Sequence, residues 1–178
     1  MIRRATKEDV EAVAASYEEL LSYEEAHGSF TNWQRGVYPT RQTAEDSVRE
    51  GILYVYEEDG EVLASMRLNH VQPEGYETAN WRYPAEGEAV LVIHTLCVPP
   101  RLSGRGIGKK MLAYAAEYAE RTGCLVIRFD TYEGNTKAAG MYDHLGYEFV
   151  GTIDTLFEGS IPEKLKLYER RVGQENEK

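Results

Sequence analysis

Residues 89–112 read AVLVIHTLCVPPRLSGRGIGKKML, and the architecture of the protein can be inferred outward from them. The apolar run from Ala89 to Val98 predicts a strand buried on both faces, as in a sheet that is covered by helices. Two prolines, Pro99 and Pro100, end this strand. The segment Ser103–Lys110 then brings three glycines to the start of a predicted amphipathic helix.

The glycine-rich segment has the features of an anion site. Gly104, Gly106 and Gly108 allow backbone dihedral angles that other residues avoid and a close approach to a ligand. The first N–H groups of the following helix lack helical acceptors and carry positive potential, which suits a phosphate. The spacing fits neither the P-loop G-x-x-x-x-G-K-[ST] nor the dinucleotide-binding G-x-G-x-x-G. The loop alone leaves a purely structural turn open.

The charge distribution supports an anion site. The net charge is −10, which argues against nucleic acid as the principal partner. Residues 89–116 contain no Asp or Glu, yet they contain Arg101, Arg105, Lys109 and Lys110. A solvated basic face would explain this too, but the interleaved glycines favour anion binding.

Elements on either side of this stretch alternate between helical and strand patterns. We expect strands and helices that together predict a mixed α/β sheet with helices on both faces. Residues 1–173 are expected to form one domain and residues 174–178 a charged tail. The strands are expected at residues 2–5, 52–56, 62–68, 89–98, 124–130, 147–153 and 165–171, and the helices at 7–25, 43–50, 108–121 and 135–145.

Several classes of protein are not expected. No segment is apolar over the length of a membrane span and the N-terminus lacks a signal-peptide pattern, so we expect a cytoplasmic protein without membrane contact. Cys97 and Cys124 lie in predicted strands and are expected to be small buried side chains. No Cys/His spacing of the zinc type occurs, so we expect no metal.

Two motifs resemble the GCN5-related N-acetyltransferase (GNAT) superfamily. The first is Ser103-Gly104-Arg105-Gly106-Ile107-Gly108, which is similar to the family's [Gln/Arg]-x-x-Gly-x-[Gly/Ala] pyrophosphate loop, with Ser103 as a departure. The register Arg101-x-x-Gly104-x-Gly106 also satisfies the pattern, but Gly108 then occupies none of the pattern's glycine positions. The second motif is Asn135-x-x-Ala138-x-x-x-Tyr142-x-x-x-Gly146-Tyr147.

The resemblance implies a largely antiparallel central sheet, the GNAT acyl-CoA N-acyltransferase fold, and acetyl-CoA as cosubstrate. It implies transfer to a small-molecule or peptide amine, and it leaves a homodimer possible. The implied coenzyme-binding residues are Leu96, Cys97, Val98, Ser103, Gly104, Arg105, Gly106, Ile107, Gly108, Lys109, Asn135, Ala138 and Tyr142.

Acetyl transfer to an amine needs a proton acceptor for the amine and an acid for the leaving thiolate. Tyr142 is the candidate acid, because the family motif places a tyrosine there. His94 is the candidate base, since histidine titrates near neutral pH, although a structural histidine is the alternative. His70 is a weaker candidate base. Candidate residues for the acceptor pocket are Trp33, Tyr38, Trp81 and Asp130, with Tyr76 as a further aromatic.

The sequence leaves four interpretations of the function open. The first is direct transfer in a ternary complex, and the second is an acyl-enzyme on Cys97. The third is a non-catalytic acyl-CoA sensor that uses the same loop. The fourth, a nucleotide-binding module, has the least support from the motifs.

Overall fold

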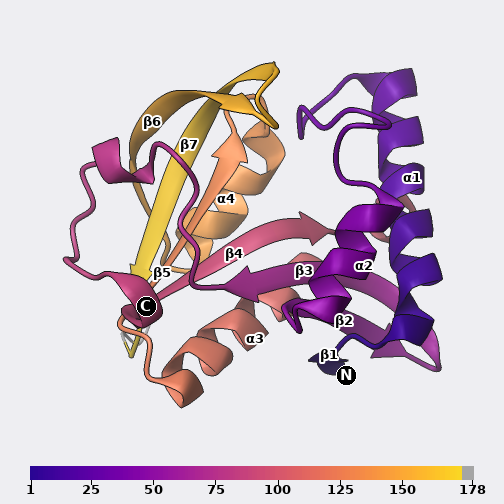
Figure 1. Ribbon diagram of the computed structural model, residues 1–178, viewed down its shortest axis with the longest axis horizontal. Helices are drawn as coiled ribbons and strands as arrows, with labels where there is room; N and C mark the ends of the chain where they lie inside the picture. Colours follow the sequence, from indigo (N-terminus) through magenta and orange to yellow (C-terminus); the bar gives the residue numbers. More distant parts are fainter. Residues whose placement is uncertain (174–178) are drawn as a thin grey trace. The chain divides into compact units, whose positions relative to one another are not determined.

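The computed structural model describes residues 1–173, apart from the side chain of Lys137, and the predicted tail at 174–178 lies outside the described residues. Figure 1 shows the elements along the chain. They are β1 (Ile2–Arg4), η1 (Lys7–Asp9), α1 (Val10–His27), α2 (Arg41–Arg49), β2 (Leu53–Glu58), β3 (Glu61–Asn69), η2 (Tyr76–Thr78), η3 (Gly87–Ala89), β4 (Val90–Cys97), η4 (Pro100–Leu102), α3 (Ile107–Thr122), β5 (Val126–Tyr132), α4 (Thr136–His144), β6 (Glu148–Phe157) and β7 (Ile161–Arg171).

The strands form a mixed sheet in the order β1-β2-β3-β4-β5-β7-β6. Strand β4 pairs with β5 in parallel, whereas β1–β2, β2–β3, β5–β7 and β6–β7 are antiparallel. The predicted mixed and largely antiparallel sheet is therefore confirmed.

The described chain forms two compact units. The first unit contains Met1–Ser29, Trp33–Leu68 and His94–Tyr114. The second unit contains Phe30–Asn32, Asn69–Ile93 and the residues from Ala115 onward. Strand β4 and helix α3 each contribute their two halves to different units.

In the first unit, helices α1 and α2 pack side by side (Figure 1). Helix α1 buries apolar residues at helical spacing, and Tyr17 among them is only 1% exposed. Helix α2 begins at Arg41, two residues before the predicted Thr43, because Thr40 is its N-cap. The Thr40 hydroxyl accepts a hydrogen bond from the Thr43 N–H at 3.3 Å.

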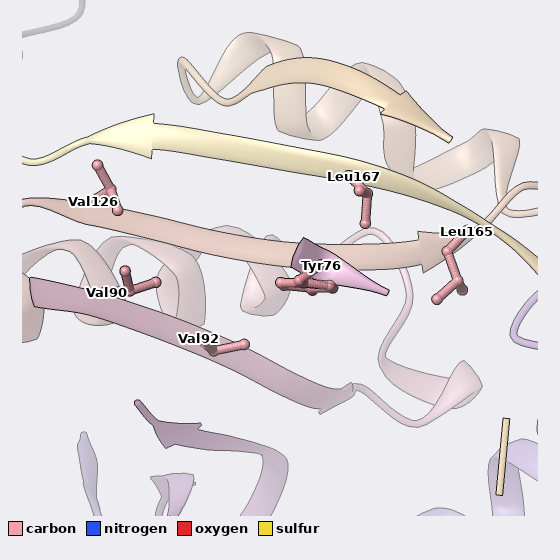
Figure 2. Packing of buried hydrophobic residues seen from close by; sticks show 6 residues of the cluster. All are labelled: Tyr76, Val90, Val92, Val126, Leu165 and Leu167. Carbon is pink, nitrogen blue, oxygen red and sulfur yellow. The ribbon is translucent and has the colours of Figure 1, made fainter. Parts of the chain in front are cut away.

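The core of the second unit lies against three neighbouring strands. Figure 2 shows Tyr76 from η2 among aliphatic side chains of β4, β5 and β7. These side chains are Val90, Val92, Val126, Leu165 and Leu167. The apolar run of the predicted central strand is therefore buried as expected over its first half.

Strands β6 and β7 are longer than the sequence pattern predicts. The pattern ends the first strand at Ile153 and begins the second at Leu165, but the two strands pair as far as Phe157 and Ile161. Half-buried and exposed residues alternate almost throughout β6, and none of its residues is fully buried, so its outer part has no regular apolar face. Glu158, with φ of 50°, and Gly159, with φ of 68°, form the turn.

Candidate active site

The predicted phosphate loop joins β4 to α3 through the short helix η4. Gly104 and Gly106 have φ values of 81° and 74°, in the left-handed region that favours glycine. A Cβ atom added to either residue would have no atom within 4 Å. The backbone dihedral angles therefore require glycine, and the space beside both residues is open to a ligand.

Two buried side chains hold the ends of this exposed loop. Leu102 is 5% exposed and Ile107 is 3% exposed, whereas residues 103–106 between them are exposed. The first backbone bond of α3 runs from the Lys110 N–H to the Gly106 carbonyl at 3.1 Å. The N–H groups of Ile107, Gly108 and Lys109 precede this bond and have no helical acceptor. The loop thus offers main-chain N–H groups without helical acceptors at an exposed helix N-terminus, which is the arrangement of an anion site.

Cationic side chains around the loop are held by strand β2. Arg105 donates to the Glu58 carboxylate at 2.8 Å. The Lys110 ammonium donates to the Tyr56 hydroxyl at 3.0 Å and lies 5.0 Å from the centre of that ring. These contacts hold positive charge beside the exposed glycines, as a phosphate site requires.

Arg101, which precedes the loop, is paired with acids. Its guanidinium pairs with Glu19 at 3.0 Å and with Glu61 at 3.1 Å. These groups line a cavity of about 470 Å³ whose other charged lining residues are Glu8 and Asp9. The Arg101 side chain is thus held by carboxylates, and the register that begins at Ser103 stays a prediction.

Strand β4 presents the candidate base next to a distorted residue. His94 is half-buried, and Thr95 after it has φ of 50°, which is unusual for a β-branched residue. The Thr95 hydroxyl shares a hydrogen bond with the hydroxyl of Tyr38. Tyr38 also makes an edge contact with Trp33, at 6.0 Å between ring centres. Three predicted site elements, Trp33, Tyr38 and strand β4, thus meet in the first unit.

Three residues that are expected to bind the coenzyme lie at the end of strand β4 or directly after it. Leu96 and Val98 are half-buried, while Cys97 between them is fully buried. The ladder with β5 covers Val90–Val92 and Val126–Arg128, and both strands continue past it.

In the second unit, the side chains of Tyr142 and Asn135 both interact with the hydroxyl of Thr131. Tyr142 is 7% exposed and packs against Phe129, at 4.6 Å between ring centres. The Asn135 amide donates to the Thr131 hydroxyl at 3.1 Å. Burial raises the pKa of Tyr142, and the same Thr131 hydroxyl opposes this rise. The structure therefore brings together two residues of the second motif, with the half-buried Ala138 one turn along α4.

Asp130 belongs to a buried polar group that also contains a residue absent from the predictions. The Tyr76 hydroxyl donates to the Asp130 carboxylate at 2.8 Å, and burial raises the pKa of Asp130. Glu163 on β7 is 9% exposed, and burial, then the charge of Asp130, raise its pKa to about 7. In the sequence, Glu163 alternates with Ile161 and Leu165, a spacing that places all three on one face of a strand. It was missed because the predicted strand begins only at Leu165.

Trp81 and His70 lie in the packing of the second unit. Arg128 stacks over Trp81 at 4.3 Å, and the indole N–H donates to the Tyr76 carbonyl at 2.8 Å. Nδ1 of His70 lies 2.9 Å from the Val90 carbonyl oxygen. These contacts account for both side chains without a ligand.

Residues 1–173 contain neither a metal-binding cluster nor a membrane-spanning helix. No group of three or more His, Cys, Asp or Glu in this part of the chain could hold a metal ion. No described helix combines the length and apolar character that a membrane crossing needs.

Comparison with known families gives one family match. The model of the acetyltransferase (GNAT) family matches residues 14–147. The uncharacterized N-acetyltransferase YhfO of Bacillus subtilis is 24% identical over 147 residues, which cover 83% of this chain and 89% of YhfO. The N-acetyltransferase YesJ of the same species is 28% identical over 108 residues, or 59% of this chain. The matched part spans 57% of YesJ.

Solved structures share the fold at low sequence identity. A GNAT-family acetyltransferase from Streptococcus agalactiae superimposes with a TM-score of 0.81 at 21% identity, covering 98% of this chain and 96% of that one. The protein yncA from Salmonella typhimurium, solved with its cofactor acetyl-CoA, gives a TM-score of 0.67 at 19% identity. That match covers 99% of this chain and 95% of yncA.

Proposed function

The chain belongs to the acetyltransferase (GNAT) family, and on that premise we propose that it transfers acetyl from acetyl-CoA to a primary amine. The transfer is direct, within a ternary complex of protein, acetyl-CoA and amine. One observation carries the proposal: an exposed loop with Gly104 and Gly106 at positive φ leads into the N-terminus of α3. Such a loop binds a diphosphate through main-chain N–H groups.

Tyr142 is the proposed acid for the leaving thiolate. A phenol is protonated at neutral pH at its ordinary pKa, and burial raises the pKa of Tyr142 further, so the hydroxyl is present there as a hydrogen-bond donor. The contacts with Phe129 and Tyr168, at 4.6 and 5.1 Å between ring centres, fix the direction of the ring. A fixed, protonated donor is what a departing thiolate needs.

His94 is the proposed proton acceptor for the amine. A histidine is partly neutral near pH 7 and can then take a proton from an ammonium group. Glu163 is a second candidate, because a carboxyl group with a pKa of about 7 is also a base at neutral pH. Asp130 supplies negative charge beside Glu163, which suits a cationic acceptor.

The position of Cys97 supports direct transfer over an acyl-enzyme. Its thiol is fully buried, and burial raises its pKa to about 12. The nucleophilic form of cysteine is the thiolate, which is scarce at such a pKa. A non-catalytic acyl-CoA sensor would keep the loop but would not need the acid at Tyr142.

A single domain over residues 1–173, a homodimer and a cytoplasmic location stay predictions.

The proposal is tested with Tyr142→Phe, with Tyr147→Phe as the matched control. Tyr147 also packs its buried ring against Phe129, at 4.9 Å between ring centres. Release of coenzyme A from acetyl-CoA is measured with a panel of primary amines. We expect Tyr142→Phe to lower kcat by about ten- to ten-thousand-fold, because the acid is lost, while acetyl-CoA still binds. Tyr147→Phe should keep its activity.

Two outcomes would contradict this account. Unchanged turnover of Tyr142→Phe would remove Tyr142 from the mechanism. Binding of acetyl-CoA without turnover of any amine by the unaltered protein would favour the sensor instead.

A further inference from the structure

A second group of polar side chains is buried in the first unit. Tyr17 of α1 and Ser65 of β3 are each 1% exposed, and neither hydroxyl has a hydrogen-bond partner among the described residues. Burial raises the pKa of Tyr17, and the Ser65 hydroxyl and the Arg67 guanidinium oppose that rise. The three polar groups therefore lie close together.

Arg67 carries the charge of this group. Its Nε is buried and has no partner, and its Nη1 donates to the Tyr38 hydroxyl at 3.3 Å. Several other arginines of the first unit pair with carboxylates, as Arg101 and Arg105 do. No carboxylate among residues 1–173 forms such an ion pair with Arg67.

An acid that interacts with Arg67 is already engaged by other groups. Asp46 of α2 is close enough for Arg67 to lower its pKa slightly, after larger effects from Gln42 and Arg49. Its carboxylate accepts hydrogen bonds from Gln42 at 3.0 Å and pairs with Arg49 at 2.7 Å. The charge of Arg67 is thus left without a direct counterion.

Unpartnered buried donors are costly and rare in folded proteins. Each such group lowers the stability of the fold, and a charged one lowers it more. Here three of them, on Tyr17, Ser65 and Arg67, converge. A ligand that accepts hydrogen bonds and brings negative charge would satisfy all three at once.

We propose that Arg67, Tyr17 and Ser65 bind a carboxylate group of the acceptor, so that the acceptor is an amine bearing a carboxylate, such as an α-amino acid. The inference rests on the proposed acetyl transfer. A guanidinium presents parallel N–H donors that match a carboxylate, and hydroxyl groups can donate to the remaining lone pairs. One arginine balances the single charge of a carboxylate, whereas a phosphate dianion would need more positive charge.

The position of the group relative to strand β4 supports this use. The Tyr38 hydroxyl accepts from Arg67 and shares a hydrogen bond with Thr95. Thr95 directly follows His94, the proposed base. A carboxylate held at Arg67 would therefore anchor an acceptor beside the strand segment that carries the base.

The test compares each of a panel of L-amino acids with its carboxamide. The amine of the carboxamide loses its proton more easily, so a preference for the acid cannot arise from the amine itself. We expect kcat/KM for the preferred acid to exceed that of its amide by about ten-fold or more. Arg67→Gln should lower kcat/KM for the acid by about ten- to a hundred-fold and change that for the amide by less than about three-fold.

Two further variants control for the fold and for charge. Arg67→Lys keeps the charge but loses the parallel donors, so it should recover only part of the preference. Arg41→Gln removes an exposed arginine from α2 of the same unit and should leave the preference intact. Equal kcat/KM for acids and amides in the unaltered protein would overturn the proposal, as would an equal loss on both in Arg67→Gln.

A binding measurement separates this inference from the proposed function. The same amino acids are titrated calorimetrically into the unaltered protein and into Arg67→Gln. If no amine is acetylated, acetyl transfer is wrong, but binding of an amino acid that is lost in Arg67→Gln still supports the carboxylate site. If no amino acid binds or reacts, the carboxylate site is wrong.

Discussion

At the scale of single residues, burial decides what each ionisable group can do. Burial raises the pKa of Tyr142 and the pKa of Cys97, which keeps a phenol available as an acid and makes a thiol inert as a nucleophile. Glu163 shows the same effect near neutral pH. Its raised pKa arises from burial first and from the charge of Asp130 second.

The raised pKa of Glu163 has a consequence for stability. The ordinary value is 4.5 and the folded value about 7, so between these values the folded protein binds a proton that the unfolded chain has released. Stability should therefore fall as pH rises through this window. Glu163→Gln mimics the protonated group, so it should raise the free energy of unfolding at pH ~8 by about 1 to 3 kcal/mol and have little effect near pH ~4.

Urea unfolding at the two pH values measures this difference. Glu133→Gln, at an exposed position in the second unit, is the control and should show no such pH dependence. An equal effect of Glu163→Gln at both pH values would show that folding does not raise the pKa of Glu163.

At the scale of elements, helix α3 has a glycine with positive φ at each end. Gly106 precedes its first residue, and Gly123, with φ of 78°, follows its last. At neither position would an added Cβ meet an atom within 4 Å. The backbone strain of an alanine is therefore similar at both ends, but only Gly106 lies in the proposed diphosphate loop.

Alanine at these two positions separates folding from binding. Gly106→Ala and Gly123→Ala should each cost about 1 to 2 kcal/mol of unfolding free energy, because alanine is strained at positive φ. Only Gly106→Ala should weaken coenzyme A binding, by about ten-fold or more, since its methyl group occupies the space beside the loop. Equal coenzyme affinity in the two variants would contradict a role for the loop in binding.

The elements near the loop were predictable because their signals are local. The buried strand before the loop and the glycines that begin α3 appear as patterns within a few residues. The outer halves of β6 and β7 were not predictable, since their polar residues alternate with few apolar ones. The group of Tyr17, Ser65 and Arg67 was not predictable either, because α1 and β3 meet only in the folded chain.

At the scale of the whole molecule, the distribution of charge matters more than its sum. The chain carries a net charge of −10, and its acids lie outside residues 89–116. Exposed cations of the loop, such as Lys109, therefore stand out against an acidic background. Opposite potentials at separate places suit a protein that receives an anionic coenzyme and an acceptor that carries an ammonium group.

The central claim is that the loop between β4 and α3 binds the diphosphate of coenzyme A. Calorimetric titration of the unaltered protein with coenzyme A tests it most directly, with ATP and NAD as comparison ligands. We predict saturable heat with coenzyme A, tighter binding than with either nucleotide, and a weaker response in Gly106→Ala. Absence of heat and of saturation with coenzyme A at millimolar concentration would contradict the account.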